Sequence, residues 1–186
     1  MLVATPSGVT LAPEGGAHQS IATPLVGMAQ DGLCSFEPAF PDELAVVMRF
    51  GFDYMQRHAG SAPDEAEPDA RTWLRDATGG SLYLRLSARP LEQPLRTMTP
   101  DLEREIIDGG YWMRRPGPNA DVVIAYTGAV APEAIAAAGL IGESRRDIGL
   151  LAITSADRLN AGWTAAQRAR EAGFASAQSH IETLMA

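Results

Sequence analysis

Two short, almost wholly apolar runs in the second half of the chain constrain its fold more than any other feature. Residues 121–127 (DVVIAYT) and 148–154 (IGLLAIT) are each followed by a turn of small residues and by a segment with helical spacing. Such runs are typical of strands buried on both faces, as in parallel sheets. Strands and helices that alternate through short loops predict a βαβ arrangement. We therefore expect both runs to be buried parallel strands.

Periodicity and helix-end signals predict the other elements. We expect helices over about residues 20–30, 41–57, 100–107, 131–140, 155–171 and 180–185, and strands over 33–37, 81–87 and 111–114. Residues 89–100 hold three prolines and few apolar side chains, which favours a linker between two substructures. The predicted fold class is α/β, with parallel-sheet layers and flanking helices.

The composition excludes several function classes. The formal net charge of the 186 residues is -8, which argues against a nucleic-acid partner and against an anionic membrane surface. The chain has no lysine, so a P-loop lysine, a Schiff base and a lipoyl-bearing lysine are all excluded. It also lacks a bilayer-length apolar run and a signal-peptide pattern, so we expect a cytoplasmic protein.

The glycine-rich segment near the N-terminus is the most unusual candidate site. Gly15 and Gly16 allow a ligand to approach the backbone closely, and Glu14 and His18 flank them. A histidine in such a loop can exchange protons near neutral pH. From these residues alone the signal is weak, because one histidine and one glutamate also occur together in ordinary surface loops.

Two arginines bracket the end of the predicted strand 81–87. Arg85 and Arg89 lie where parallel strands deliver binding residues, and a guanidinium suits a carboxylate or a phosphate. A salt bridge to one of the many acidic residues is an equally good interpretation.

The single cysteine and the other two histidines are expected to have structural roles. Cys34, the single cysteine, lies in an apolar stretch and is expected to be buried packing rather than a nucleophile. His58 ends a predicted helix, where a cation is favourable, and His180 has no obvious partner. The scattered histidines and the one cysteine show no metal-ligand spacing, so no metal site is expected.

Taken in order, several segments resemble a known family. They are TPSGVTLAPEGGAHQS, TPLVGMAQDGL, FEPAFPDELAVVMRFGFDYM, LYLRLSARPLEQP, GGYWMRRPGPNADVVIAYTGAVAPEAIAAAG and DIGLLAITSADRLNAGW. The chain resembles the homodimeric type of the thiamine-diphosphate-dependent pyruvate dehydrogenase E1 component, in the transketolase-like family. The resemblance implies that residues 1–95 are the later half of a pyrimidine-binding domain. Residues 96–186 then correspond to the first part of a transketolase C-terminal-type domain.

The resemblance also assigns roles to four residues. His18 matches the histidine that lies over the thiazolium and contacts the substrate carbonyl, which makes it the candidate catalytic residue. Glu14 falls where transketolases place an acid near the substrate hydroxyls, and Gln19 neighbours that site. Arg89 matches a residue that binds the sugar phosphate in transketolases, and with a 2-oxoacid it would serve the carboxylate or only the structure.

The resemblance implies a partial enzyme. The family's aminopyrimidine-protonating glutamate and its diphosphate and magnesium motif have no counterpart here, so tight binding of thiamine diphosphate or magnesium by this chain alone is not expected. The implied function is part of a pyruvate dehydrogenase E1 component, inactive alone. The implied partners are a second copy or a complementary E1 chain, with a lipoyl-bearing E2 in the complete enzyme. A transketolase acting on sugar phosphates and a non-catalytic α/β interaction module are the alternatives.

Overall fold

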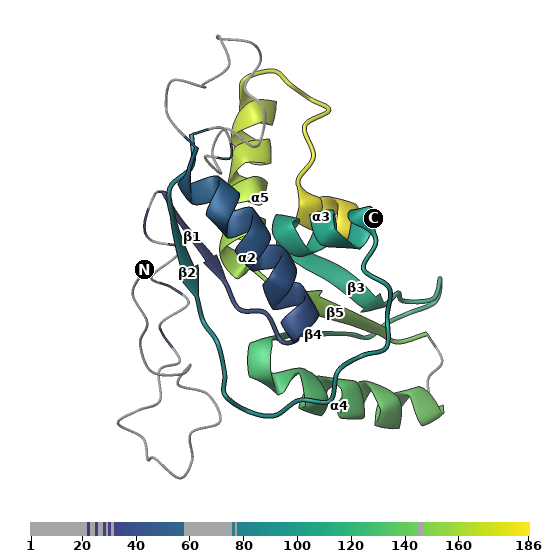
Figure 1. The fold of residues 1–186 in the computed structure, drawn as a ribbon. Coiled ribbons are helices and arrows are strands. Elements are labelled where there is room, and N and C mark those ends of the chain that lie inside the picture. Colours follow the sequence, from purple (N-terminus) through teal and green to yellow (C-terminus); the bar gives the residue numbers. More distant parts are fainter. Residues whose placement is uncertain are drawn as a thin grey trace.

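The computed structural model describes residues 22, 25, 28, 30, 32–57, 76, 78–144 and 147–186. In chain order the elements are β1 (Leu33–Phe36), α2 (Pro41–Met55), β2 (Ser81–Leu84), α3 (Pro100–Asp108), β3 (Gly110–Arg114), β4 (Val123–Thr127), the 3₁₀ turn η5 (Gly128–Val130), α4 (Ala131–Ser144), β5 (Gly149–Ile153), α5 (Ala156–Glu171) and α6 (His180–Met185). The chain is a mixed α/β protein with parallel strands and flanking helices, as predicted (Figure 1). The predicted site residues Glu14, His18 and Gln19 lie outside the described residues, as does the predicted helix end at His58.

The first half forms a parallel pair of strands covered by one helix. β1 pairs with β2 in register from Leu33 opposite Ser81 to Phe36 opposite Leu84. α2 begins with Pro41, and the carboxylate of Glu43 in its first turn accepts hydrogen bonds from the backbone N–H of Ala39 and of Phe40. A proline at the first helical position and an acid in the first turn both favour a helix start.

The second half forms a three-stranded sheet in the order β3–β5–β4. β4 and β5 are parallel and are connected through α4, which confirms the predicted βαβ unit. β3 runs antiparallel to β5, with an irregularity between Trp112 and Arg114. The Ser155 hydroxyl caps α5 by accepting from the N–H of Arg158, as its position before the helix predicts.

One sequence prediction about the strands is wrong. β5 is buried along almost its whole length, but β4 is the edge strand of its sheet, and Val123 and Ala125 are exposed. Both runs have the same apolar composition, and composition reports the character of the side chains rather than the position of a strand in a sheet. Only the pairing partner on each side distinguishes the two strands.

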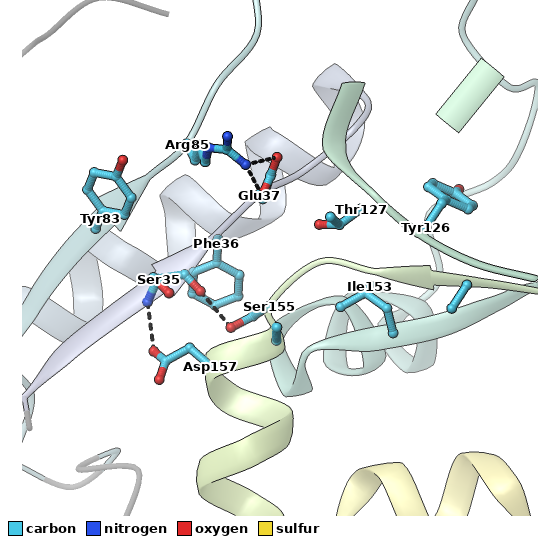
Figure 2. A pocket seen from close by; sticks show the side chains of 12 residues that line it. Ser35, Phe36, Glu37, Tyr83, Arg85, Tyr126, Thr127, Ile153, Ser155 and Asp157 are labelled. Atoms are coloured by element: carbon cyan, nitrogen blue, oxygen red, sulfur yellow. Dashed lines mark hydrogen bonds and ion pairs between the residues drawn. The ribbon is translucent and has the colours of Figure 1, made fainter. Parts of the chain in front are cut away.

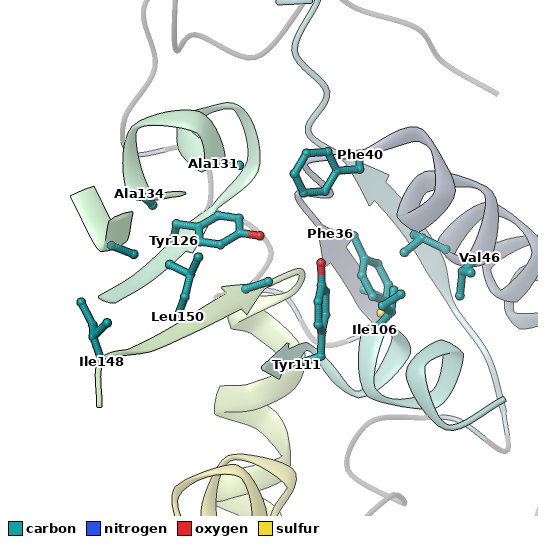
Figure 3. Packing of buried hydrophobic residues seen from close by; sticks show 14 of the residues in the cluster. Phe36, Phe40, Val46, Ile106, Tyr111, Tyr126, Ala131, Ala134, Ile148 and Leu150 are labelled. Atoms are coloured by element: carbon teal, nitrogen blue, oxygen red, sulfur yellow. The ribbon is translucent and has the colours of Figure 1, made fainter. Parts of the chain in front are cut away.

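A single hydrophobic core joins the two halves (Figure 3). Phe36 and Phe40 come from the first half, and Ile106, Tyr111 and Tyr126 come from the second. Figure 3 shows Tyr111 standing between the side chains contributed by the two halves. Its hydroxyl is the polar end of an otherwise apolar contact, and such a group needs a partner when it is buried.

The linker between β2 and α3 is anchored to this core by Arg96. The guanidinium lies between two aromatic rings, 5.5 Å from the centroid of Phe40 and 5.1 Å from that of Tyr111. It donates to both carboxylate oxygens of Asp42, at 2.7 and 2.8 Å, and also to the Tyr111 hydroxyl. Tyr111 in turn donates to Glu43 at 2.5 Å. The linker has no regular secondary structure, as predicted, and this network fixes its path.

Candidate functional site

A pocket of about 390 Å³ opens where the carboxyl ends of four strands meet (Figure 2). β1, β2, β4 and β5 all contribute to its lining, together with the first turn of α5. The lining residues are Ser35, Phe36, Glu37, Tyr83, Arg85, Ala125, Tyr126, Thr127, Ile153, Ser155, Ala156 and Asp157. In open α/β sheets the carboxyl ends of the strands are where ligands bind, and here two sheets direct these ends into one space. The pocket is therefore the candidate site of the described residues.

A buried ion pair forms one wall of the pocket. A single guanidinium nitrogen of Arg85, Nη1, donates to both carboxylate oxygens of Glu37, at 2.8 and 3.0 Å. The side chains are 6% and 12% exposed, so water screens the pair poorly. Burial raises the pKa of the Glu37 carboxyl, and the bond to Arg85 acts in the opposite direction. Arg85 is thus the structural salt bridge that the sequence offered as one of two interpretations.

Gly128 allows this wall to lie close to the end of β4. Its φ is +53°, and a Cβ on it would lie 2.7 Å from Cγ and from Oε1 of Glu37. A side chain at position 128 would therefore displace the carboxylate as well as strain the backbone. Gly128 therefore leaves room for the Glu37 carboxylate.

Asp157 forms the opposite wall and ties the two halves of the chain together. Its Oδ2 accepts from the backbone N–H of Ser35 at 3.0 Å, and the neighbouring Ser155 hydroxyl donates to the Ser35 carbonyl at 2.6 Å (Figure 2). Burial raises the pKa of the Asp157 carboxyl, which the Ser35 N–H opposes. Asp157 is the carboxylate of the pocket that faces no arginine at salt-bridge distance among the described residues. A half-buried carboxyl of this kind can accept or hold a proton.

Arg89, the fourth residue that the resemblance singles out, lies in the linker, and its side chain contacts the start of α4. Its guanidinium donates to the Ala129 carbonyl at 2.9 Å and to both oxygens of Glu133, at 2.9 and 2.6 Å. The bond to Glu133 raises the pKa of Arg89. Arg89 does not line the pocket, and a substrate anion would have to compete with Glu133 for it. The predicted substrate role of Arg89 therefore stays a prediction.

The remaining sequence candidates have structural partners. Cys34 is buried, Nη1 of Arg158 lies 3.8 Å from its sulfur, and burial raises its pKa to about 11, so it is packing rather than a nucleophile. Arg158 itself is buried and forms two bonds with Asp76, at 2.9 and 3.0 Å. Nε2 of His180 lies 2.7 Å from the Gly110 carbonyl oxygen, a partner that the sequence did not reveal.

Sequence reasoning assigned no role to the two carboxylates of the pocket, although the carboxyl-end rule places Asp157 where parallel sheets bind ligands. Glu37 and Asp157 are 120 positions apart and belong to no recognisable motif. The sequence carried one signal: Glu37 ends one predicted strand and Asp157 follows another by three residues, which is where the carboxyl-end rule places ligand-binding groups. Applied to every strand, that rule would have selected both residues.

Comparison with known proteins establishes the fold at a coarse level. No protein-family model matches the chain, and no curated protein matches it. Solved structures that it resembles include a transketolase variant from Pichia stipitis with fructose 6-phosphate and the Pichia stipitis transketolase complex with sedoheptulose 7-phosphate. Each has a TM-score of 0.54, 18% sequence identity and an alignment covering 79% of this chain and 18% of that one. The chain shares part of the transketolase fold.

The chain spans about a fifth of the length of the transketolase chains that it matches. An alignment over 79% of the residues exceeds either half of this chain, so it includes residues on both sides of the linker.

The described residues do not fit thiamine diphosphate or its metal ion. They contain no group of three or more histidine, cysteine or acidic side chains able to hold a metal ion. The charged groups that line the pocket are two carboxylates and an arginine already bound to one of them, an arrangement that repels a diphosphate.

Among the residues that the structure describes, no helix is long and apolar enough to cross a membrane.

Proposed function

We propose that this chain is part of a thiamine-diphosphate-dependent pyruvate dehydrogenase E1 component and contributes the substrate-side histidine loop. The observation that carries the proposal is the transketolase fold likeness on both sides of the linker. The sequence resemblance to the E1 component likewise includes segments on both sides of the linker. The fold likeness therefore agrees with the sequence resemblance at the level of the transketolase-like group.

In this proposal His18 carries the chemistry of the chain. Its imidazole would hydrogen-bond the substrate carbonyl oxygen and exchange a proton there, and such a positioned group contributes about 10²–10⁴-fold to a rate. Glu14 and Gln19 would orient the substrate beside it. When bound, thiamine diphosphate supplies the electron sink for decarboxylation, and residues beyond those described here would hold it with magnesium.

The polar groups of the pocket hold the two halves of the chain together. Asp157, Ser155 and the Glu37–Arg85 pair fix the carboxyl ends of β1 and β2 against β5 and α5. β1 begins at Leu33, fourteen residues after Gln19. In the proposal the histidine loop thus precedes, in the sequence, a strand that is held firmly at its carboxyl end.

A transketolase acting on sugar phosphates is the second candidate. The similar solved structures are transketolases, among them complexes with fructose 6-phosphate and sedoheptulose 7-phosphate. Arg89 would then bind the phosphate, which requires that it release Glu133. A non-catalytic interaction module is the alternative if no cofactor-dependent activity exists.

An affinity-tagged chain expressed in its own host and purified with its partners separates these functions. We expect pyruvate oxidation with an artificial electron acceptor that depends on added thiamine diphosphate and magnesium, together with a complementary E1 chain or a lipoyl-bearing E2. The variant His18→Ala should lose about 100-fold or more of this activity. The control His58→Ala removes a histidine outside the loop and should leave the activity unchanged.

Other results would point elsewhere. Ketol transfer between sugar phosphates in place of pyruvate oxidation would establish the transketolase alternative. A purified assembly without either activity would overturn the catalytic proposal and favour the interaction module. Micromolar binding of thiamine diphosphate by the isolated chain, measured by calorimetry, would contradict the expectation that this chain alone does not hold the cofactor.

A further inference from the structure

The pocket at the carboxyl ends of the strands holds more negative than positive charge. Its lining contains two carboxylates, Glu37 and Asp157, and one arginine, Arg85, whose guanidinium binds Glu37. Asp157 has no arginine at salt-bridge distance in the part of the chain that the structure describes. The two carboxylates and the single arginine therefore leave one uncompensated negative charge, which lies at Asp157.

Arg158 follows Asp157 in α5, but its guanidinium is directed to other acids. It forms two bonds with Asp76, at 2.9 and 3.0 Å, and lies 3.8 Å from Asp108, and it does not line the pocket. Burial raises the pKa of the Asp157 carboxyl, although the N–H of Ser35 and the charge of Arg158 act in the opposite direction. The ionised carboxylate is thus less stable here than in water, and a cation beside it would offset that loss.

The rest of the lining suits the apolar part of a small molecule. Most of these side chains are aromatic or aliphatic, namely Phe36, Tyr83, Ala125, Tyr126, Ile153 and Ala156 (Figure 2). Small-molecule sites combine apolar walls with a few polar groups, and the volume of about 390 Å³ is within their usual range. Aromatic rings also attract cations to their faces. The pocket is therefore complementary to an apolar body that carries a positive charge.

The same lining disfavours an anionic ligand. A helix N-terminus attracts negative charge, but Asp157 already occupies the first turn of α5. Glu37 adds a second carboxylate directly after the end of β1. An anion would meet both carboxylates, and an uncharged ligand would leave the charge of Asp157 uncompensated.

We propose that this pocket binds a small organic monocation, an ammonium or guanidinium group on an apolar body, with the positive group beside Asp157. The net charge of -8 on the chain favours the approach of such a molecule. Binding there requires neither His18 nor thiamine diphosphate. The pocket is thus a binding site beyond the proposed E1 function and does not depend on that function.

NMR titration of the isotope-labelled full chain with three probes of similar shape tests this site. Benzylamine is a cation at neutral pH, benzyl alcohol is its uncharged counterpart, and benzoate is an anion. We expect benzylamine to shift the amide signals of Ser35 and Asp157 and to bind about tenfold more tightly than benzyl alcohol, because hydrogen bonds to charged groups are the stronger ones. Benzoate should show no saturable binding.

Three variants assign the preference to the pocket. Asp157→Asn removes the charge but keeps an oxygen for the N–H of Ser35, and it should bind benzylamine and benzyl alcohol about equally. The matched control Asp101→Asn makes the same change in net charge at an exposed carboxylate of α3 and should keep the full preference for the amine. Ala156→Leu places a larger side chain in the lining and should weaken the binding of both probes.

Equal binding of benzylamine and benzyl alcohol by the unmodified chain overturns the proposal. A preference for the amine that persists in Asp157→Asn overturns it as well, as do shifts confined to residues outside the pocket and the absence of saturable benzylamine binding. None of these titrations depends on pyruvate oxidation or on His18, so the proposed function and the pocket ligand stand or fall separately.

Discussion

The backbone N–H of Ser35 donates to the carboxylate of Asp157 at 3.0 Å, across 122 positions of the sequence. This bond joins β1 to the first turn of α5, and it lies in the wall of the candidate pocket. The pocket is therefore also the seam between the two halves. Substitutions of its polar groups should therefore change the stability of the fold as well as the binding of any ligand.

Replacing either partner of the Glu37–Arg85 ion pair should destabilise the fold. Removing one partner of a buried ion pair leaves an uncompensated charge, and Arg85→Met or Glu37→Leu should each lower the free energy of unfolding by about 3–5 kcal/mol. The double variant replaces the pair with apolar groups and should cost much less than the sum of the two. Urea denaturation of all four proteins measures this cycle. Additive single-variant losses would show that the two side chains do not depend on each other.

The variant Asp157→Asn should show a pH-dependent gain in stability. The folded state raises the pKa of the Asp157 carboxyl above its ordinary 3.8, so the folded protein binds this proton more tightly than the unfolded one. The contribution of this group is fully present below pH 3.8 and is lost as the pH rises through the raised folded pKa. Asparagine does not titrate and still offers an oxygen to the N–H of Ser35.

Relative to the original protein, Asp157→Asn should therefore gain stability across that window and keep the gain at higher pH. Denaturation curves between about pH 3 and pH 7 measure the difference. A difference that is constant, or that shrinks as the pH rises, would contradict the raised pKa.

Substitution of Gly128 by alanine should disturb the pocket. The new Cβ would meet Glu37 at 2.7 Å and the residue would keep a positive φ, so we expect a loss of at least about 1 kcal/mol in unfolding free energy. The matched control is Gly139→Ala in α4, where a Cβ meets nothing within 4 Å. That change should stabilise the helix by about 0.5–1 kcal/mol. Equal effects at both positions would mean that Glu37 moves aside freely.

Cys34 should be nearly inert in the folded protein. Burial raises its pKa from 9.0 to about 11, and the thiolate is the form that reacts. Alkylation by iodoacetamide at pH 8 should be about 100-fold slower in the folded chain than in the same chain unfolded in urea. Mass spectrometry of timed samples gives both rates. Comparable rates would show that the β1 region opens readily.

Sequence reasoning predicted the elements well where periodicity and end signals agreed. The helix expected over 41–57 is Pro41–Met55, and the one expected over 155–171 is Ala156–Glu171 with Ser155 as its cap. Gly173, a residue type that commonly ends helices, follows the cap residue Ala172 with a φ of +100°. Local backbone chemistry sets these boundaries, so a single sequence suffices to find them.

Long-range relations were less predictable for a physical reason. The antiparallel direction of β3, the edge position of β4 and the placement of Glu37 and Asp157 in one pocket all depend on which segments pack together. Hydrophobic patterning shows that a strand is apolar, and it carries no information about its neighbours. The histidine loop lies outside the described residues, so its role depends on the resemblance alone.

The anchored linker makes this chain a candidate for division into two complementing fragments. Arg89 holds the linker to the start of α4 and Arg96 holds it to α2, while Leu95 between these anchors is fully exposed at 104%. A protease cut between Glu92 and Gln93, both exposed, would leave one anchor on each fragment. The shared core would then hold the fragments together, so that covalent continuity is dispensable once the chain has folded.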